Sequence, residues 1–401
     1  MKISVERQSG QLPGTVRLSG VITSSEGVRT VWYDLPAAME PFLSESGAPW
    51  LLTMLPFAAA IGESIELSLP VDPFFLENVR GLIGTWNSWH PHLKRIDIQA
   101  PTVRASPTAG HAAQFFSGGF DSWFTLLRHV ESTRRFPQIG DVDDLITVWG
   151  LDIPINRDDE FRQLADGARE VAARYAKHHI AVSTNLREAM SGNWGFVWGP
   201  QWGPLSHGTA LAAVGLLLEK RYSKVRIAST HRFWELFPWG SNPLTDTLFS
   251  TSATAFVHDH ALYSRTDKLE RIAESDWALS KLKVCYKEGA FRNCSVCLKC
   301  HRTLLCFDIL GILPKAASFD VTAYQKNRGR HILVSDQNDM VRLTEVRDFA
   351  EKYNRRDIVT LMNQSLSRSE LVHRVTKPLA KVSWRARSMA YRRLAGDMIG
   401  S

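Results

Sequence analysis

A short apolar strand, a loop with two adjacent glycines and a helix follow one another between His111 and Arg128. Adjacent glycines let the backbone turn sharply and approach a ligand closely. The helix start offers unpaired N–H donors and partial positive charge, which suit a phosphate group. We therefore expect a phosphate-binding loop, with the hydroxyls of its two serines turned toward one spot. The loop reads Ser117-Gly118-Gly119-Phe120-Asp121-Ser122.

The carboxylate of Asp121 would repel a bound phosphate unless a cation lay between them. Mg²⁺ is the expected cation, because it prefers oxygen ligands. The loop is not that of kinases and GTPases, since their pattern ends in Gly-Lys-Ser/Thr and no lysine follows Gly119. The alternative interpretation is an ordinary strand–turn–helix corner capped by a serine.

From His111 onward, apolar strand patterns alternate with helical patterns. Strands separated by helices predict an α/β fold, a parallel sheet with helices on both faces, in which ligands bind beyond the carboxyl ends of the strands. After the first strand and helix, the predicted strands are Leu145–Leu151, Ile180–Ser183 and Lys224–Ser229, and the predicted helices are Glu160–His178 and Leu205–Glu219.

The flanking regions differ from this central part, so we expect three domains. Residues 1–105 alternate apolar and polar residues in several short stretches and predict a β-rich domain. A linker rich in Pro, Ser, Thr and Ala follows and leads into the α/β domain, residues 111–312. Residues 315–401 predict a helical, increasingly basic extension.

Composition narrows the class of protein. With 44% hydrophobic and 22% charged residues, the 401-residue chain is typical of a soluble globular protein. No apolar run approaches the ~20 residues that span a bilayer, and the first residues lack a secretory segment. We therefore expect a cytoplasmic protein without a membrane partner. The net charge of +7 suits anionic ligands such as ATP or RNA without choosing between them.

A second local signal lies at Ser264-Arg265-Thr266-Asp267. Ser264 and Asp267 have capping-box spacing, which predicts a helix beginning at Ser264. Arg265 then lies in the first turn, where its charge opposes the helix dipole. A bound anion would explain this position. The alternative interpretation, equally compatible with the position, is that Arg265 is exposed and has no role.

The cysteines cluster downstream in the spacing C-x8-C-x2-C-x2-C. Such a set can surround one tetrahedral Zn²⁺, and an iron–sulfur cluster is the alternative, since it also takes four thiolates. Neighbouring His301 is interpreted as lying in the second shell or at the surface, and Cys306 as a core residue. The four candidate ligands are Cys285, Cys294, Cys297 and Cys300.

Candidate substrate contacts come from a loop rich in Trp and Gly and from positions after the third and fourth strands. Trp194 and Trp198 could stack on a flat heterocycle, or pack inward as part of a folded loop. The remaining candidates are His207, Thr209, His231 and Glu235. From Arg374 onward, a basic tail fits nucleic acid or an acidic partner, and a solvated helix or a disordered end is the alternative.

The loop and the cysteine spacing together resemble the N-type ATP pyrophosphatases, the PP-loop enzymes, and within them the 7-cyano-7-deazaguanine synthase family of queuosine biosynthesis. The resemblance spans about Ala113–Leu310. It implies a PP-loop (HUP-like) fold, a Cys₄ zinc knot, and binding of ATP pyrophosphate and Mg²⁺ by the loop Ser117–Ser122, Phe120 included. It further implies a catalytic contribution from Asp121, Ser122 and Arg265, the last replacing the lysine of the family's Ser-Lys-x-Glu helix start.

The implied reaction is that of a ligase-type enzyme. A substrate carboxylate, such as that of 7-carboxy-7-deazaguanine, would be adenylated with release of pyrophosphate. It would then be amidated by ammonia and dehydrated to a nitrile in a second ATP-driven step, or joined to a protein acceptor. The family's Tyr-Gly-Gln and Pro-Gly-Arg-Asn segments are replaced here by Trp149–Asp152 and Gly203–Gly208. These departures, with the added terminal regions, are typical of a divergent paralogue. Such relatives occur in antiviral defence operons, and a homodimer is compatible with the resemblance.

Two other hypotheses remain open at the level of sequence. The first is a PP-loop tRNA-modifying enzyme that adenylates a base, motivated by the basic carboxyl-terminal region. The second is a partner-binding protein whose nucleotide site no longer turns over. The intact Asp121 and loop serines argue against the second hypothesis.

Overall fold

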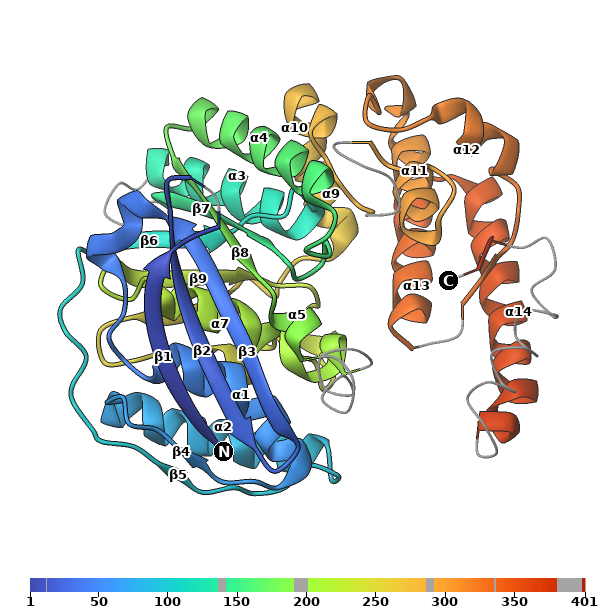
Figure 1. Cartoon of the computed structure of the whole chain (residues 1–401). Coiled ribbons are helices and arrows are strands. Elements are labelled where there is room, and N and C mark those ends of the chain that lie inside the picture. Colours follow the sequence, from blue (N-terminus) through green and yellow to red (C-terminus); the bar gives the residue numbers. More distant parts are fainter. Residues whose placement is uncertain are drawn as a thin grey trace. The chain divides into compact units, whose positions relative to one another are not determined.

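The computed structural model describes residues 1–11, 13–135, 142–190, 201–285, 292–334, 337–380 and 399–400 (Figure 1). The chain forms two compact units. The first unit comprises Met1–Ser117 and Thr125–Leu262, and the second comprises Gly118–Phe124 and Tyr263–Ser401. Helix α3, Phe120–Arg135, begins in a segment of the second unit and continues into the first.

A ten-stranded sheet organises the first unit, in the order β10-β9-β6-β7-β8-β3-β2-β1-β4-β5. Its strands are β1 (Lys2–Ser9), β2 (Thr15–Ser24), β3 (Gly27–Pro36), β4 (Ile65–Glu66), β5 (Ile98–Gln99), β6 (His111–Phe115), β7 (Asp144–Trp149), β8 (His178–Thr184), β9 (Tyr222–Ala228) and β10 (Ala255–Asp259).

The five strands from β10 to β8 are parallel to one another. Their apolar residues are buried on both faces, as helices covering a parallel sheet require. Counted from β6, these strands lie in the doubly wound order 3-2-1-4-5, so the order reverses at β6, between β7 and β9. In such sheets, ligands bind beyond the carboxyl ends of the strands at the reversal. The loop after Phe115 follows the strand at which the order reverses.

Antiparallel strands from the first 36 residues extend the same sheet. β3 joins β8 through the pairs Tyr33↔Thr184 and Asp34↔Ser183. β2 pairs along its whole length with β3 and also with β1. The predicted boundary near residue 105 therefore does not separate two sheets. Because the free edge of β8 is completed by β3, the amino-terminal strands share the core of the α/β region.

Helices flank this sheet. α4 contacts β7 and β8, whereas α7 contacts β9 and packs on α1 (Figure 1). α1, α2 and α7 share one hydrophobic core with the strands. The helices of the first unit are η1 (Ala37–Phe42), α1 (Ala48–Ile61), α2 (Pro73–Trp89), α4 (Asp158–Arg174), α5 (Leu186–Ala189), η4 (Trp202–Ser206), α7 (His207–Leu217), η5 (Phe233–Glu235), α8 (Pro243–Asp246) and η6 (Thr247–Phe249).

The second unit is mainly helical, with α13 packed on α9, α11 and α14. A short parallel pair, β11 (Ile332–Leu333) with β12 (Ile399–Gly400), completes it. The cysteine cluster therefore groups with the carboxyl-terminal helices rather than with the parallel sheet. The helices are α9 (Arg265–Ala273), α10 (Asp276–Ser280), α11 (Leu298–Leu310), η7 (Leu313–Lys315), α12 (Val321–Asn327), α13 (Gln337–Lys352) and α14 (Arg356–Ala380).

Candidate anion and metal sites

The glycine loop has the backbone geometry that its sequence predicts. Gly118 has a φ of +74°, a left-handed conformation that L side chains rarely adopt. The carbonyl of Gly119 then accepts a hydrogen bond of 3.0 Å from the N–H of Trp123 and opens α3. Gly118 thus supplies the turn and Gly119 the start of the helix, as expected of a loop that cradles an anion.

The two serines of the loop lie in different surroundings. Ser122 is buried, and its hydroxyl donates to the carbonyl oxygen of Gly119 at 3.1 Å. Ser117 is exposed and ends the first segment of the first unit. The convergence of the two hydroxyls on one ligand therefore stays a prediction.

Asp121 is held by two cationic side chains of α9. Lys268 donates from Nζ to Oδ1 at 2.7 Å, and Arg265 donates from Nη2 to Oδ2 at 3.4 Å. The Lys268 side chain is only 1% exposed, so this ion pair is largely shielded from water. Burial would raise the pKa of Asp121, but the charges of Lys268 and then Arg265 outweigh it and lower that pKa.

The capping box predicted for α9 is confirmed. The Ser264 hydroxyl accepts from the N–H of Asp267 at 3.0 Å, and the Asp267 carboxylate accepts from the N–H of Ser264 at 2.8 Å. The box begins the helix and places Arg265 in its first turn. The Nε of Arg265 is buried and finds no acceptor among the residues that the structure describes. A buried donor of this kind is costly unless a ligand satisfies it.

Lys268 is the residue of this site that sequence reasoning missed. The family resemblance drew attention to Arg265, whereas the buried ammonium that contacts Asp121 comes one turn later on the same helix. The available signal was the i, i+3 spacing, which places Arg265 and Lys268 on one face of α9.

Two further ion pairs, each with a buried arginine, lie in the same unit. Arg302 on α11 donates to Asp339 on α13 at 2.6 Å. Arg342, also on α13, donates from Nη1 to both oxygens of Glu345 at 3.0 Å each. The side chains of Arg342 and Glu345 are each 3% exposed. α11 and α13 therefore bring additional guanidinium groups into the unit that holds Asp121.

Lys283 links the glycine loop to the cysteine segment. Its backbone N–H donates to the Gly118 carbonyl at 2.8 Å, and its ammonium donates to the carbonyl of Arg292 at 2.8 Å. The amide side chain of Asn293 joins the two halves of the cysteine segment, because it accepts from the N–H of Val284 and donates to the carbonyl of Leu282. The backbone of the loop and that of the cysteine segment are thus directly connected.

The four predicted cysteines converge in the structure, with sulfur atoms that all lie within 4.8 Å of one another. The sulfurs of Cys294 and Cys300 are 3.8 Å apart. A tetrahedral Zn²⁺ with Zn–S bonds of about 2.3 Å requires sulfur separations of about 3.8 Å. The cluster therefore fits a closed Cys₄ site, which leaves no coordination position for a substrate.

The thiols of this cluster affect one another's ionisation. Hydrogen bonding with Cys285, followed by Cys297 and burial, raises the pKa of the Cys300 thiol far above its ordinary value. Four crowded thiols resist ionisation unless a cation compensates their charge. Cys306 lies outside the cluster and is buried, as predicted. His301 is also buried rather than at the surface, 5.3 Å from the Tyr324 ring.

Two of the substrate candidates belong to one aromatic cluster in the first unit. His207 lies 5.7 Å and His231 lies 6.0 Å from the Trp239 ring, between ring centroids. Phe237 is 4.7 Å from His231, and Trp202 is 6.0 Å from His207. η4, the π-helical turn that precedes His207, carries Trp202. π-Helical turns often occur at functional sites.

The other substrate candidates are engaged elsewhere or are not described. The Thr209 hydroxyl is buried and donates to the carbonyl of Ser206, the residue just before α7, at 2.9 Å. Glu235 accepts from the Nε of Arg232 at 2.8 Å. Trp194 and Trp198 lie outside the described residues, as does the basic region after Ala380. Their proposed contacts stay predictions.

A polar cluster at the end of β10 was not predicted. The Asp259 carboxylate accepts hydrogen bonds from Thr125 at 2.9 Å, Arg128 at 2.8 Å and His129 at 3.0 Å. Burial would raise the pKa of Asp259, but the His129 hydrogen bond and neighbouring charge lower it well below its usual range. All three donors lie on α3, so Asp259 fixes this helix to the sheet of the first unit.

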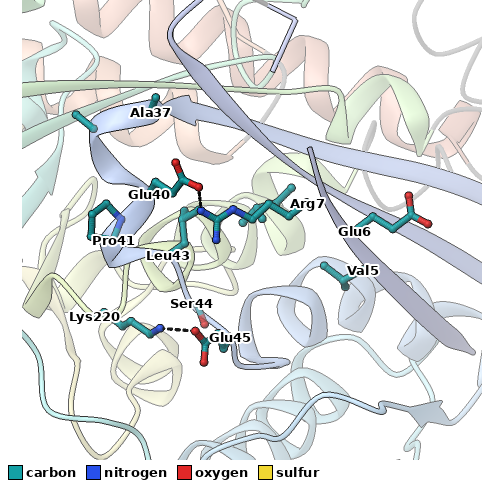
Figure 2. Close-up of a pocket in the computed structure, with 12 residues that line it drawn as sticks. Val5, Glu6, Arg7, Ala37, Glu40, Pro41, Leu43, Ser44, Glu45 and Lys220 are labelled. Carbon is teal, nitrogen blue, oxygen red and sulfur yellow. Dashed lines mark hydrogen bonds and ion pairs between the residues drawn. The ribbon is translucent and has the colours of Figure 1, made fainter. Parts of the chain in front are cut away.

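A hollow of about 680 Å³ lies in the first unit. Residues of β1, η1 and neighbouring segments line it (Figure 2). Charges of both signs line it, and four of these side chains form pairs, Arg7 with Glu40, and Lys220 with Glu45 at 2.8 Å. The hollow therefore gathers no convergent set of one charge, unlike the surroundings of Asp121.

Comparisons with known proteins give no relative for this chain: no family model matches it, and no curated protein or solved structure matches it reliably. Within the described part of the chain, no helix combines the length and the apolar character needed to cross a membrane. Function is therefore inferred from the geometry of the sites and from the sequence motifs in them.

Proposed function

We propose that the chain is an ATP-dependent enzyme of the PP-loop type that adenylates a substrate carboxylate and releases pyrophosphate. The observation that carries this proposal is the contact of Asp121, in the Ser-Gly-Gly-Phe-Asp-Ser loop, with Lys268 and Arg265 at the capped start of α9. Two cations, a glycine turn and a helix start near one carboxylate form a site suited to a polyphosphate.

The residues of the loop would act by binding and charge compensation rather than by covalent chemistry. Lys268 and Arg265 would stabilise the negative charge that develops on pyrophosphate as it leaves the α-phosphate. Asp121 is the carboxylate that would hold Mg²⁺, which when bound neutralises phosphate charge and polarises the phosphoryl oxygens. The buried Nε of Arg265 would donate to a phosphate oxygen.

The substrate class follows from the resemblance together with the aromatic cluster. A flat, deazaguanine-like carboxylate such as 7-carboxy-7-deazaguanine is the proposed acceptor of the adenylyl group. His207 and His231, grouped with Trp239 and Phe237, are the described candidates for contact with its ring. The acyl group of the adenylate would then pass to ammonia, giving the amide and AMP, and a second ATP-driven step would dehydrate the amide to the nitrile; alternatively, the acyl group would pass to a protein acceptor.

The four cysteines are proposed to hold Zn²⁺ in a structural role. Their sulfur separations fit a closed tetrahedral site, and Lys283 joins the cysteine segment to the Gly118 carbonyl. The metal would therefore organise the segment that supports the phosphate loop, without taking part in bond making.

A second candidate function is nucleotide binding without turnover, in a protein that binds a partner. One observation favours it: both oxygens of Asp121 already contact cationic side chains, which could replace Mg²⁺. This candidate predicts that ATP binds without forming AMP, with or without a partner.

Product analysis distinguishes the two candidates. Full-length protein with ATP, Mg²⁺ and 7-carboxy-7-deazaguanine should form AMP and pyrophosphate, and Asp121→Asn or Lys268→Gln should abolish both. Arg271→Gln is the matched control, because Arg271 lies on the same helix in an outward ion pair with Glu274. ATP binding without AMP would favour the second candidate, and ADP as the product would contradict the proposed reaction.

A further inference from the structure

The aromatic cluster of the first unit includes two rings from one loop, residues 237–242. The N–H of Gly240 in this loop donates to the carbonyl of Gly203 at 3.0 Å. An added Cβ at Gly240 would lie 2.6 Å from Nδ1 of His207, the first residue of α7. The loop is therefore packed closely against the start of α7.

A buried carboxylate joins this loop to the sheet. Asp246 on α8 is fully buried, and its carboxylate accepts hydrogen bonds from the N–H of Asn242 at 3.0 Å and from the hydroxyl of Ser241 at 2.7 Å. It also accepts from Nδ1 of His258 on β10, at 2.8 Å. Because the Ser241 hydroxyl donates to the carboxylate rather than to the imidazole, these side chains form an Asp–His dyad and not a nucleophilic triad.

The other ring nitrogen of His258 is a buried acceptor. The His258 side chain is only 5% exposed, and its Nε2 is buried without a hydrogen bond to any residue that the structure describes. Nδ1 carries the proton that the ionised carboxylate of Asp246 accepts, so the neutral ring keeps a lone pair on Nε2. A buried acceptor of this kind is costly unless a donor satisfies it.

His258 lies at the edge of the sheet where ligands bind in folds of this kind. The register from β10 through β9 to β6 places it level with Phe115, the last residue of β6. Phe256, two residues earlier on β10, would contact an added Cβ at Gly215 of α7 at 2.9 Å. Because strand side chains alternate between faces, His258 shares the face that α7 covers. α7 leads from β8 back to the start of β9, so His207 begins it at the same edge.

We infer that Nε2 of His258 accepts a hydrogen bond from an N–H group of the flat heterocycle held by the aromatic cluster, and that Asp246 fixes the tautomer that can accept it. The inference rests on the proposed function, because it takes a deazaguanine-like ring as the ligand. Such a ring carries N–H donors at its edge, whereas ionised carboxylate and phosphate groups only accept. His258 therefore contributes to selection of the ring and not of the phosphates.

Calorimetric titration of 7-carboxy-7-deazaguanine into the full-length protein tests this inference. An ATP analogue with a methylene bridge between the α and β phosphates is present throughout and prevents turnover. His258→Asn keeps an amide donor near the position of Nδ1 and loses the acceptor at Nε2, so it should weaken binding by about tenfold. His258→Gln keeps an acceptor near the position of Nε2 and loses the contact with Asp246, so it should bind within about threefold of the unmodified protein.

Two further variants complete the set. Asp246→Asn turns an amide N–H toward Nδ1, which moves the ring proton of His258 to Nε2 and converts the acceptor into a donor. It should therefore weaken binding by about tenfold as well. His178→Asn is the control, since its side chain is 73% exposed at the first residue of β8, the opposite edge of the sheet. The control should bind as the unmodified protein does.

Weaker binding by His258→Asn than by His258→Gln supports the inference, because a merely structural bond to Asp246 would be kept by asparagine and lost by glutamine. Equal effects, the reverse order, or no binding by the unmodified protein would overturn it. If His258→Asn does not fold, nitrogen NMR of the unmodified protein decides. A shift of the His258 Nε2 resonance on addition of 7-carboxy-7-deazaguanine supports the inference, and an unchanged resonance overturns it.

Two separate measurements identify the ring and the reaction. Titration of ATP alone should give the same affinity for His258→Asn as for the unmodified protein, and a loss would overturn the inference, because the donor would then belong to adenine. AMP formation is measured on its own. AMP formed while His258→Asn binds 7-carboxy-7-deazaguanine normally overturns the inference and leaves the proposed reaction standing. The expected loss of affinity without AMP contradicts the reaction and supports the ring site.

Discussion

At the scale of single residues, the contact between Lys268 and Asp121 organises the candidate anion site. A buried ammonium is stable in charged form only beside a carboxylate, because desolvation otherwise favours the neutral amine. Asp121 is the carboxylate that holds it, at 2.7 Å. The pair also makes the stability of the fold sensitive to substitution, since removal of either partner leaves an uncompensated charge away from water.

We therefore expect Lys268→Gln to lower the free energy of unfolding by about 3 kcal/mol, in the range found for broken buried ion pairs. Arg271→Gln on the same helix should change it by less than about 0.5 kcal/mol. Denaturant unfolding of the full-length protein measures both variants. Equal effects of the two substitutions would contradict the assignment of Lys268 to a buried pair.

The pH dependence of stability follows from the lowered pKa of Asp121. A carboxyl whose pKa is lower in the folded state stabilises the fold above its unfolded pKa of about 3.9 and loses that contribution as the pH falls through the folded pKa. We expect Asp121→Asn to remove part of the stability loss below about pH 4. Unfolding curves at several acidic pH values test this, and identical slopes for both proteins would exclude a contribution from Asp121.

At the scale of elements, the cysteine segment supports the loop through Lys283. Because a tetrahedral metal would fix the backbone on both sides of Asn293, loss of the metal should loosen Gly118 and the start of α3. We expect Cys297→Ser to lose bound metal and solubility, and to increase amide hydrogen exchange near Trp123. Metal analysis and exchange measurements test this. A soluble, zinc-free and active variant would refute a structural role.

Gly150 follows β7 at a point where the chain lies so close to the backbone of Thr184 that no side chain fits. Its φ is +95°, and an added Cβ would lie 1.7 Å from the Thr184 carbonyl oxygen. We expect Gly150→Ala to destabilise the protein by more than about 2 kcal/mol, because clash and backbone strain combine. Gly84→Ala in α2 is the control, since its Cβ meets nothing within 4 Å. It should stabilise by about 0.5–1 kcal/mol, as a helical alanine does. Thermal unfolding measures the stability of both variants, and equal changes in stability would contradict this geometry.

At the scale of the whole molecule, the alternation of strands and helices after His111 could be predicted, because the apolar residues of each element recur with the period of a strand or of a helix. The strands β6 to β9 and the helices α3, α4, α7 and α9 lie where the pattern predicted them, within a few residues. α1 was not predicted as a helix, since it is apolar on every side and contains Pro56, so it shows no amphipathic period.

What could not be read from the sequence is which distant segments pair. Three such links join residues more than a hundred positions apart. They are the pairing of β3 with β8, the contact of Lys268 with Asp121, and the hydrogen bonds that Asp259 accepts from side chains on α3. No local periodicity encodes such pairings, because they depend on which edges and charges remain to be satisfied after the elements form. The cysteine cluster was readable because three of its four members lie close together in the chain.

Exchange of radiolabelled pyrophosphate into ATP is the most direct measure of reversible adenylation at this loop, because it requires a bound adenylate and pyrophosphate to recombine at one site. We predict exchange that depends on Mg²⁺ and on the carboxylate substrate 7-carboxy-7-deazaguanine. We also predict that Lys268→Gln abolishes this exchange and that Arg271→Gln retains it. Exchange that survives in Lys268→Gln, or its absence from the unmodified protein while ATP is bound, would contradict the claim that this loop holds pyrophosphate during adenylation.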